Sequence, residues 1–296
     1  MRIRNFKNID DFKMPRECIT YNNFKKLPIS VQNLSLKKGK SYLKKRFSGK
    51  LLDINVSHAF NLEKRIHSKK EALNYYGLDT RKPTCLICNH AWWDFPHCLN
   101  MTNFVDFIEW LEVTYEVASK SKNINWLFKP HPLENWYGGL KVKELFPKTP
   151  KNIKILNLNE DSLTALNVSD FVITMFGTVG YEAATQNKIV INGDKSHYED
   201  WDVSYTAKSK KDYIGIISNL ETLKRKSKKK LSNAYALAYF TADSHPKELN
   251  LLKYVDDTNQ KEIYKFIKKI NFEENSAENN EIELLSNWLK SPNESY

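Results

Sequence analysis

A histidine held between two prolines is the side chain of this sequence that is best placed to do chemistry. The segment reads Lys129-Pro130-His131-Pro132, and each proline ring fixes its own φ angle, so a stiff loop aims the imidazole. Near neutral pH an imidazole donates or accepts hydrogen bonds, and Lys129 adds a compact positive charge beside it. Both residue types suit a phosphate or a diphosphate. The alternative is a loop histidine that caps backbone groups.

A second stretch, Phe176-Gly177-Thr178-Val179, has the residue types of an anion-binding turn at the start of a helix. Gly177 lets a ligand approach the backbone closely, and Thr178 either caps the helix or donates its hydroxyl to a phosphate. Free N–H groups and the positive end of the helix dipole meet at such a turn. Glu182 follows four residues after Thr178, so both can face one side, and its carboxylate suits ribose hydroxyls. The alternatives are a plain cap and an exposed helical glutamate.

A third set of residues has the types needed for acid–base catalysis. Transfer of a group to a hydroxyl requires a base for that hydroxyl, or a group that stabilises the departing charge. Asp94, His90 and Glu134 are the catalytic candidates. Asn89 and Trp93 accompany the first two and are expected on the side of the accepting molecule. The alternative is that the tryptophans and the aspartate form a packed aromatic corner.

Five short, apolar runs that favour strands alternate with helical patterns and position these groups. The strands are expected at residues 84–89, 125–129, 153–156, 171–175 and 189–192. This alternation predicts an α/β fold with a Rossmann-like parallel sheet and helices on both faces. Ligands of open parallel sheets bind outside the carboxyl ends of the strands, where all the candidate residues lie. The loop after the fifth strand adds His197 to them.

The helical patterns extend beyond the sheet toward the C-terminus. Helices are expected at residues 62–76, 103–120, a short one ending near 145, 162–166, 179–186, 210–220, 222–240, 246–254, 259–270 and 281–290. Residues 1–60 have weak periodicity and a possible strand at 18–21. We therefore predict a basic N-terminal extension or reduced domain at 1–68 and a Rossmann-like domain at 69–272. An acidic linker with a terminal helix is predicted at 273–296.

The net charge of +11 resides in the N-terminal fifth of the chain. Residues 1–65 hold 16 of the 46 Lys and Arg but 5 of the 35 Asp and Glu, which leaves 30 of each sign for the remainder. The basic residues are densest at 37–46. Such a segment suits an anionic membrane surface, nucleic acid or an acidic partner, or it is a solvated arm. No nucleic-acid-binding motif accompanies it, which disfavours that class.

The cysteines and the apolar runs indicate where the protein resides and whether it binds a metal. Four cysteines are too few for a disulfide scaffold and indicate a reducing cytoplasm, and no run suggests a membrane span or a signal peptide. Cys85 and Cys88 are three residues apart within one predicted strand, so they face opposite ways and do not chelate one ion. Asp200 and Asp202 form an Asp-x-Asp pair after the last predicted strand, and we do not expect this pair to bind a metal. We expect neither a metal nor another cofactor.

The two anion-binding stretches together resemble the nucleotide-binding half of GT-B glycosyltransferases. The matching residues are Phe128-Lys129-Pro130-His131-Pro132, then Ser169-Asp170, then Gly177-Thr178-Val179-Gly180-Tyr181-Glu182-Ala183. The pattern is most similar to the bacterial capsule polysaccharide biosynthesis family that includes Kdo transferases, and it spans roughly residues 70–245. The polyol-phosphate transferases of teichoic-acid synthesis share a similar pattern more distantly. The turn Phe-Gly-Thr replaces the Ser-Ser or Ser-Thr pair that is frequent in the family.

The resemblance implies a metal-independent enzyme that transfers a sugar from a nucleotide-activated donor, with a CMP-linked sugar among the candidates. The acceptor would be a saccharide or a lipid-linked chain of a surface or capsular polysaccharide. The donor-binding residues implied are Lys129, His131, Pro132, Gly177, Thr178, Val179, Glu182 and His197. Such an enzyme would be cytoplasmic, peripheral at the membrane, and able to join other polysaccharide-synthesis proteins.

The N-terminal part is shorter than the resemblance implies. GT-B enzymes bind the acceptor with a full N-terminal Rossmann domain, whereas about 80 residues precede the first predicted strand here. The N-domain is then reduced, another chain completes the site, or catalysis has been lost. The last alternative makes the chain a non-catalytic nucleotide-binding subunit of a polysaccharide-synthesis complex. A polyol-phosphate transferase would differ only in its donor.

Overall fold

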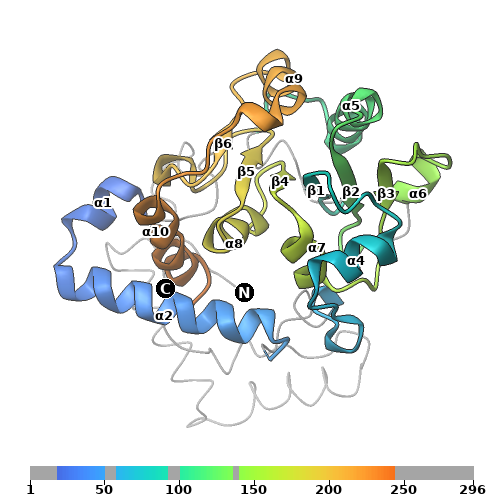
Figure 1. The fold of residues 1–296 in the computed structure, drawn as a ribbon. Coiled ribbons are helices and arrows are strands. Elements are labelled where there is room, and N and C mark those ends of the chain that lie inside the picture. Colours follow the sequence, from blue (N-terminus) through green and yellow to red (C-terminus); the bar gives the residue numbers. More distant parts are fainter. Residues whose placement is uncertain (1–18, 51–57, 93–100, 136–139, 244–296) are drawn as a thin grey trace, which may run out of the picture. The chain divides into compact units, whose positions relative to one another are not determined.

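The computed structural model describes residues 19–50, 58–92, 101–135 and 140–243, and it confirms the predicted α/β fold (Figure 1). In these residues six parallel strands form one sheet in the order β3-β2-β1-β4-β5-β6. The strands are β1 (Thr84–Cys88), β2 (Asn125–Lys129), β3 (Ile153–Ile155), β4 (Phe171–Thr174), β5 (Ile189–Asn192) and β6 (Tyr205–Thr206). This is the order of a doubly wound Rossmann sheet, in which the chain changes its direction of travel between β1 and β4.

The five predicted strands are confirmed to within one residue, and a sixth was not expected. β1 pairs with β2 over its full length and with β4 from Cys85 to Ile87, so the carboxyl ends of these three strands lie side by side. β6 comprises only Tyr205 and Thr206. Two residues are too few for an alternating hydrophobic pattern, which explains why the sequence did not predict this strand.

Alternate side chains of the strands supply two separate hydrophobic clusters, one on each face of the sheet. Leu86 and Val172 belong to one cluster and Ile87 and Ile173 to the other, as strand geometry requires. Helices cover both faces, as predicted. The first face carries α4 (Lys69–Tyr76), α7 (Ser162–Val168), α8 (Val179–Thr185) and α10 (Lys228–Ala238), and the second carries α5 (Phe107–Lys120), α6 (Val142–Leu145) and α9 (Lys210–Ser218).

Three helices begin four to seven residues later than hydrophobic periodicity predicts, because a capping side chain sets each start. Periodicity gives starts at residues 62, 103 and 222, whereas Ser68, Asp106 and Ser227 accept hydrogen bonds from the first turns of α4, α5 and α10. Residues Leu62–Lys64 and Leu220–Thr222 form separate 3-10 turns, and a π-helical turn, Tyr239–Asp243, follows α10. The other predicted helices agree to within two residues where the structure describes them. Those near 246–254, 259–270 and 281–290 lie outside the described residues.

The N-terminal segment is helical where a strand was expected. Thr20 caps α1 (Tyr21–Lys26), and α2 (Ile29–Phe47) follows. The buried residues of α2 are Ser35, Gly39 and Leu43, a stripe with four-residue spacing and little apolar area. This composition explains why the hydrophobic pattern of the segment was weak. The domain boundaries at 68 and 273 stay predictions.

The α2 stripe packs against α10, which Figure 1 shows crossing it. The two backbones approach so closely that a Cβ at Gly39 would overlap the carbonyl oxygen of Tyr235 and lie 2.6 Å from its carbonyl carbon. Both Leu43 and Leu237 are fully buried in the cluster on this face of the sheet. Residues of α2 therefore contribute to the same core as the sheet.

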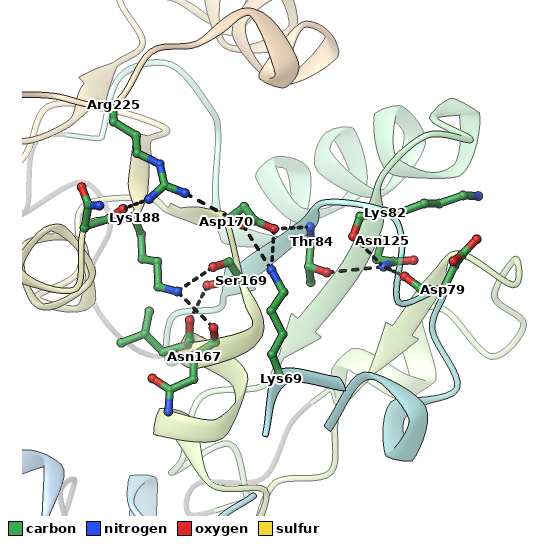
Figure 2. A network of polar contacts seen from close by, with 12 residues as sticks. Lys69, Asp79, Lys82, Thr84, Asn125, Asn167, Ser169, Asp170, Lys188 and Arg225 are labelled. Carbon is green, nitrogen blue, oxygen red and sulfur yellow. Dashed lines mark hydrogen bonds and ion pairs between the residues drawn. The ribbon is translucent and has the colours of Figure 1, made fainter. Parts of the chain in front are cut away.

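A polar network fixes the amino ends of the central strands, at the edge opposite the candidate residues (Figure 2). The Asp170 carboxylate accepts a 3.0 Å hydrogen bond from the Thr84 N–H and pairs with Lys69 at 3.1 Å and Arg225 at 4.0 Å. The ammonium of Lys188 donates to two main-chain carbonyls of the turn before β4, at 2.7 and 3.1 Å. Burial is the main reason that the pKa of Lys188 falls to about 8.

Gly39→Ala is expected to lower the free energy of unfolding by about 1–3 kcal/mol, because α2 must move away from α10 to admit the methyl group. Gly215→Ala is the matched control. Gly215 lies within α9 with open space around its Cβ position, so this change should stabilise the protein by about 0.5–1 kcal/mol. Urea unfolding of both variants measures the difference, and equal stabilities would contradict the close approach.

Lys188 is expected to contribute a rise in the free energy of unfolding with pH between about 8 and 10.5, its folded and ordinary pKa values. In this window Lys188 stays protonated in the unfolded chain and loses its proton in the folded one, so its deprotonation favours folding. Buried thiols with raised pKa values, such as that of Cys88, act in the opposite direction, so the test is the difference in slope between variants. Lys188→Met should remove that rise, whereas Lys154→Met, at an exposed lysine of β3, should keep it. Urea titrations at pH 7.5, 9 and 10.5 test this, and an unchanged slope in Lys188→Met would refute the assignment.

Candidate functional site

The turns after β1 and β4 meet at the point where open α/β sheets bind their ligands. His90 Nε2 lies 3.3 Å from Thr174 Oγ1, and that hydroxyl accepts the Gly177 N–H at 3.2 Å. The His90 ring stacks on Phe107, with 4.8 Å between ring centroids and 8° between planes. A Cβ at Gly177 would lie 3.5 Å from the imidazole. The structure thus brings together His90 and Gly177, two predicted site residues from distant parts of the sequence. Thr174, which was not predicted as a site residue, contacts both of them.

The turn after β2 is joined to the same edge through Lys129. The Asn89 N–H donates to the Lys129 carbonyl at 3.0 Å, and Lys129 Nζ donates to the carbonyl of Glu160 at 3.1 Å. Burial lowers the pKa of Lys129, a residue that is 5% exposed. The Lys129 ammonium, which we expected to face a phosphate, thus uses one of its N–H groups in a hydrogen bond to the protein's own backbone. Its role toward a ligand stays a prediction.

The imidazole of His131 is a neutral hydrogen-bond donor in the folded protein. Its Nδ1 accepts the Leu133 N–H at 3.2 Å, so in the neutral ring the proton resides on Nε2. Burial, assisted by the charge of Lys129, lowers the pKa of His131 to about 4. The sequence left open a backbone-capping histidine and a ligand-binding one. The capping contact is present, and it directs Nε2–H to serve as a donor.

Glu134, one of the catalytic candidates, makes contacts that organise its own loop. Its carboxylate accepts the Val142 N–H at the start of α6, at 3.1 Å, and its own N–H donates to the His131 carbonyl at 3.0 Å. The side chain is buried, and burial is the main cause of its raised pKa. These contacts tie Glu134 to the folding of the loop between β2 and β3.

The turn that starts α8 is held by Tyr198. Its hydroxyl lies 2.9 Å from the Gly177 carbonyl and 3.1 Å from Asn192 Oδ1, and a Cβ at Gly180 would overlap it. Thr178 has helical backbone angles and no capping hydrogen bond from its side chain, so the alternative of a plain cap is wrong. Val179 follows as the first residue of α8. Tyr198 was not among the predicted site residues, although it lies in a polar, aromatic loop that resembles a tyrosine-containing loop of the capsule polysaccharide biosynthesis family.

His197 packs edge-on against the neighbouring aromatic rings. The centroid of its ring lies 6.3 Å from that of Tyr181 and 4.9 Å from that of Tyr198. Tyr181 belongs to α8, so His197 lies against the helix that carries Glu182. Pro132 is half-buried in the loop after β2. Nothing observed at these two residues assigns them a ligand, and their donor-binding roles stay predictions.

Glu182 is paired with an arginine that the sequence did not connect to the site. Arg46 Nε donates to Glu182 Oε1 at 2.9 Å, and the two side chains are 14% and 5% exposed. The alternative of an exposed helical glutamate is therefore wrong. Arg46 was grouped with the exposed basic segment 37–46, and the structure corrects this, because Arg46 turns inward while the lysines of that segment are exposed. The sequence separation of 136 positions explains why no local pattern revealed the pair.

The Asn89 amide has no hydrogen-bond partner among the residues that the structure describes, although the residue is 8% exposed. The indole N–H of Trp92 likewise has no partner there. Buried amides are rarely left unpaired, so a partner from solvent, from a ligand or from residues outside the described ranges is expected here. Trp93 and Asp94, expected on the acceptor side and as the base, lie outside the described residues.

No protein-family model and no curated protein matches this chain. Similar solved structures include a Thermosulfurimonas dismutans KpsC, a beta Kdo 2,4 transferase, at 14% identity over 70% of this chain and 55% of that one, with a TM-score of 0.41. The wall teichoic acid polymerase TagF, as its H548A variant, matches at 12% identity over 59% and 42% (TM-score 0.35). An S. aureus MnaA–UDP co-structure matches at 13% identity over 64% and 47% (TM-score 0.38).

The chain thus spans about half the length of the solved structures that it matches. All three TM-scores are below 0.5. Within the described part of the chain, none of the helices combines the length and the apolar character that a membrane span requires.

Proposed function

We propose that the carboxyl edge of β1, β2 and β4 binds a nucleotide-activated sugar and that the protein transfers this sugar to a growing surface or capsular polysaccharide. The observation that carries the proposal is the state of His131. A stiff Pro-His-Pro loop, a backbone contact to Nδ1 and a pKa of about 4 together present a fixed Nε2–H donor at the ligand-binding edge of the sheet. A fixed donor of this kind suits a phosphate oxygen.

In this proposal the donor's phosphates accept hydrogen bonds from His131 and from the turn at Gly177–Val179, beside the charge of Lys129. These contacts strengthen as negative charge develops on the departing nucleotide, which is how preorganised donors accelerate such a transfer. No metal ion is required for this stabilisation. The Glu182 carboxylate accepts hydrogen bonds from the ribose hydroxyls. Its side chain is 5% exposed, which supports a contact shielded from water.

The base that activates the acceptor hydroxyl is assigned by position. Of the candidates that the structure describes, His90 lies against the Gly177 turn, whereas Glu134 is tied to the start of α6. We therefore place the base at His90 or at Asp94, which lies four residues later. Asn89 and Trp93 are proposed to face the acceptor, and the unpaired amide of Asn89 supports a polar contact there.

A second candidate function is a non-catalytic nucleotide-binding subunit of a polysaccharide-synthesis complex. The described residues contain one sheet, whereas the enzymes that the sequence resembles use a second Rossmann domain for the acceptor. Sugar transfer or donor hydrolysis by the purified chain alone would exclude this alternative. A polyol-phosphate transferase, the remaining alternative, would be distinguished from a glycosyltransferase by the identity of the donor substrate.

A thermal-shift screen of CMP, CDP, UDP, GDP and their sugars is expected to identify a stabilising nucleotide. His131→Ala should weaken its binding by about 10- to 100-fold, because one hydrogen bond to a charged oxygen is lost. His131→Gln keeps an N–H donor and should retain part of the affinity. Since the pKa of His131 is about 4, its contribution should not change between pH 5.5 and 8. An unchanged shift in His131→Ala would contradict the proposed donor site.

We further propose that the exposed lysines of α2 hold the protein at an anionic membrane surface. Lys37, Lys40 and Lys44 recur on one side of the helix, and each lysine near such a surface contributes about 1 kcal/mol. Replacing these three by Gln should reduce flotation with phosphatidylserine vesicles. The matched control replaces the exposed lysines 148, 151 and 154 by Gln. Equal losses in both variants, or equal binding to neutral vesicles, would exclude a specific role of α2.

A further inference from the structure

The Arg46–Glu182 ion pair connects the N-terminal helix α2 to the candidate site. Arg46 lies in the last turn of α2, and Glu182 lies in α8, directly after the turn at Gly177. The Arg46 guanidinium carbon also lies 5.8 Å from the centre of the Phe60 ring. Glu182 lies in the first turn of α8, which begins two residues after Gly177, and a Cβ at Gly177 would lie 3.5 Å from the His90 ring. Glu182 therefore belongs to the helix turn that borders the site.

Packing of α2 aims Arg46 at Glu182. Arg46 follows Gly39 by seven residues, two helical turns, so it lies on the same side of α2 as the buried stripe. The contact at Gly39 fixes α2 on α10, and the Tyr235 hydroxyl of α10 donates to the Thr185 carbonyl at the end of α8, at 3.4 Å. The three helices thus form one packed unit that places the guanidinium beside α8.

The ion pair leaves half of the Glu182 carboxylate available. Oε1 accepts the bond from Arg46, whereas Oε2 accepts none from the described residues. An ionised carboxylate has about four acceptor positions, so a ligand with hydroxyl groups can bind Oε2 while Arg46 holds Oε1. A buried ion pair contributes little net stability, because the loss of hydration offsets much of the attraction. This cost favours a role for the pair beyond stability.

We propose that Arg46 is a positioning residue that holds Glu182 in the orientation needed to bind the ribose hydroxyls of the donor nucleotide. This inference rests on the proposed function of the site. It adds that a helix far away in the sequence completes the ribose contact. Without Arg46, Glu182 loses the only hydrogen bond to its carboxylate from the described residues, and other rotamers of its side chain then compete with the binding one.

The test compares each variant's affinity for a ribonucleotide and for its 2′,3′-dideoxy counterpart, using the nucleotide that stabilises the wild type most in the thermal-shift screen. The wild type should prefer the ribonucleotide by about 10-fold or more, since its hydroxyls bond to a carboxylate. Arg46→Met and Glu182→Gln should each bring this ratio close to one while the dideoxynucleotide binds as before. Arg46→Lys should restore part of the preference. The double variant should resemble Glu182→Gln, because the two residues act as a unit.

The matched control is Lys45→Met, which removes one positive charge from the same turn of α2 at an exposed position and should keep the wild-type ratio. If Arg46→Met weakens both nucleotides equally, Arg46 has only a structural role and the inference is overturned. Should Arg46→Met fail to fold, Arg46→Lys and Arg46→Gln provide the same ratio. If the wild type binds no nucleotide, the proposed function fails and this inference fails with it. Binding without ribose preference overturns the inference and the ribose contact of Glu182, whereas the proposed nucleotide binding at His131 and Gly177 stands.

Discussion

Parallel pairing between β1 and β4 is the constraint on which the candidate site depends. Residues Cys85 to Ile87 pair with Phe171 to Ile173, so the chain leaves these two strands side by side. From there it continues to helices on opposite faces of the sheet, α5 and α8. His90 and Thr174 meet as a direct result, without a long loop to bring them together. A slip of one residue in this register would turn the strand side chains to the wrong faces, so the two hydrophobic clusters also fix the site.

Burial determines the chemical state of the polar groups at this edge of the sheet. Lys129 and His131 are the groups that sequence alone presents as cations, and burial lowers the pKa of both. The Lys129 ammonium donates a hydrogen bond to the Glu160 carbonyl. The Leu133 N–H donates to Nδ1 of His131 and so selects the tautomer of its imidazole. The edge therefore offers fixed hydrogen-bond donors more than free positive charge. Such donors need little reorganisation when a charged ligand arrives.

The sequence predicts those parts of the structure that local patterns encode. Five strands were predicted to within one residue because each is a short, mostly apolar run bounded by turn residues. Helix starts were less accurate, because capping by Ser68, Asp106 or Ser227 does not alter hydrophobic periodicity. Helix α2 was missed because small residues form much of its buried stripe. Likewise, the pairing of Arg46 with Glu182 depends on how distant helices pack, which no short pattern in one sequence encodes.

The packing of the N-terminal helices on α10 has a consequence for the order in which the protein folds. Asn233 Nδ2 in α10 donates to the Tyr21 hydroxyl in α1 at 3.2 Å, across 212 residues of sequence. At a synthesis rate of about 5–20 residues per second, α1 and α2 leave the ribosome roughly 10–40 seconds before α10 exists. The sheet has all its strands by then, but the surface that receives α2 does not yet exist. The Arg46–Glu182 contact is therefore completed late, and a nascent chain that stalls before α10 would carry a finished sheet with an unfinished site.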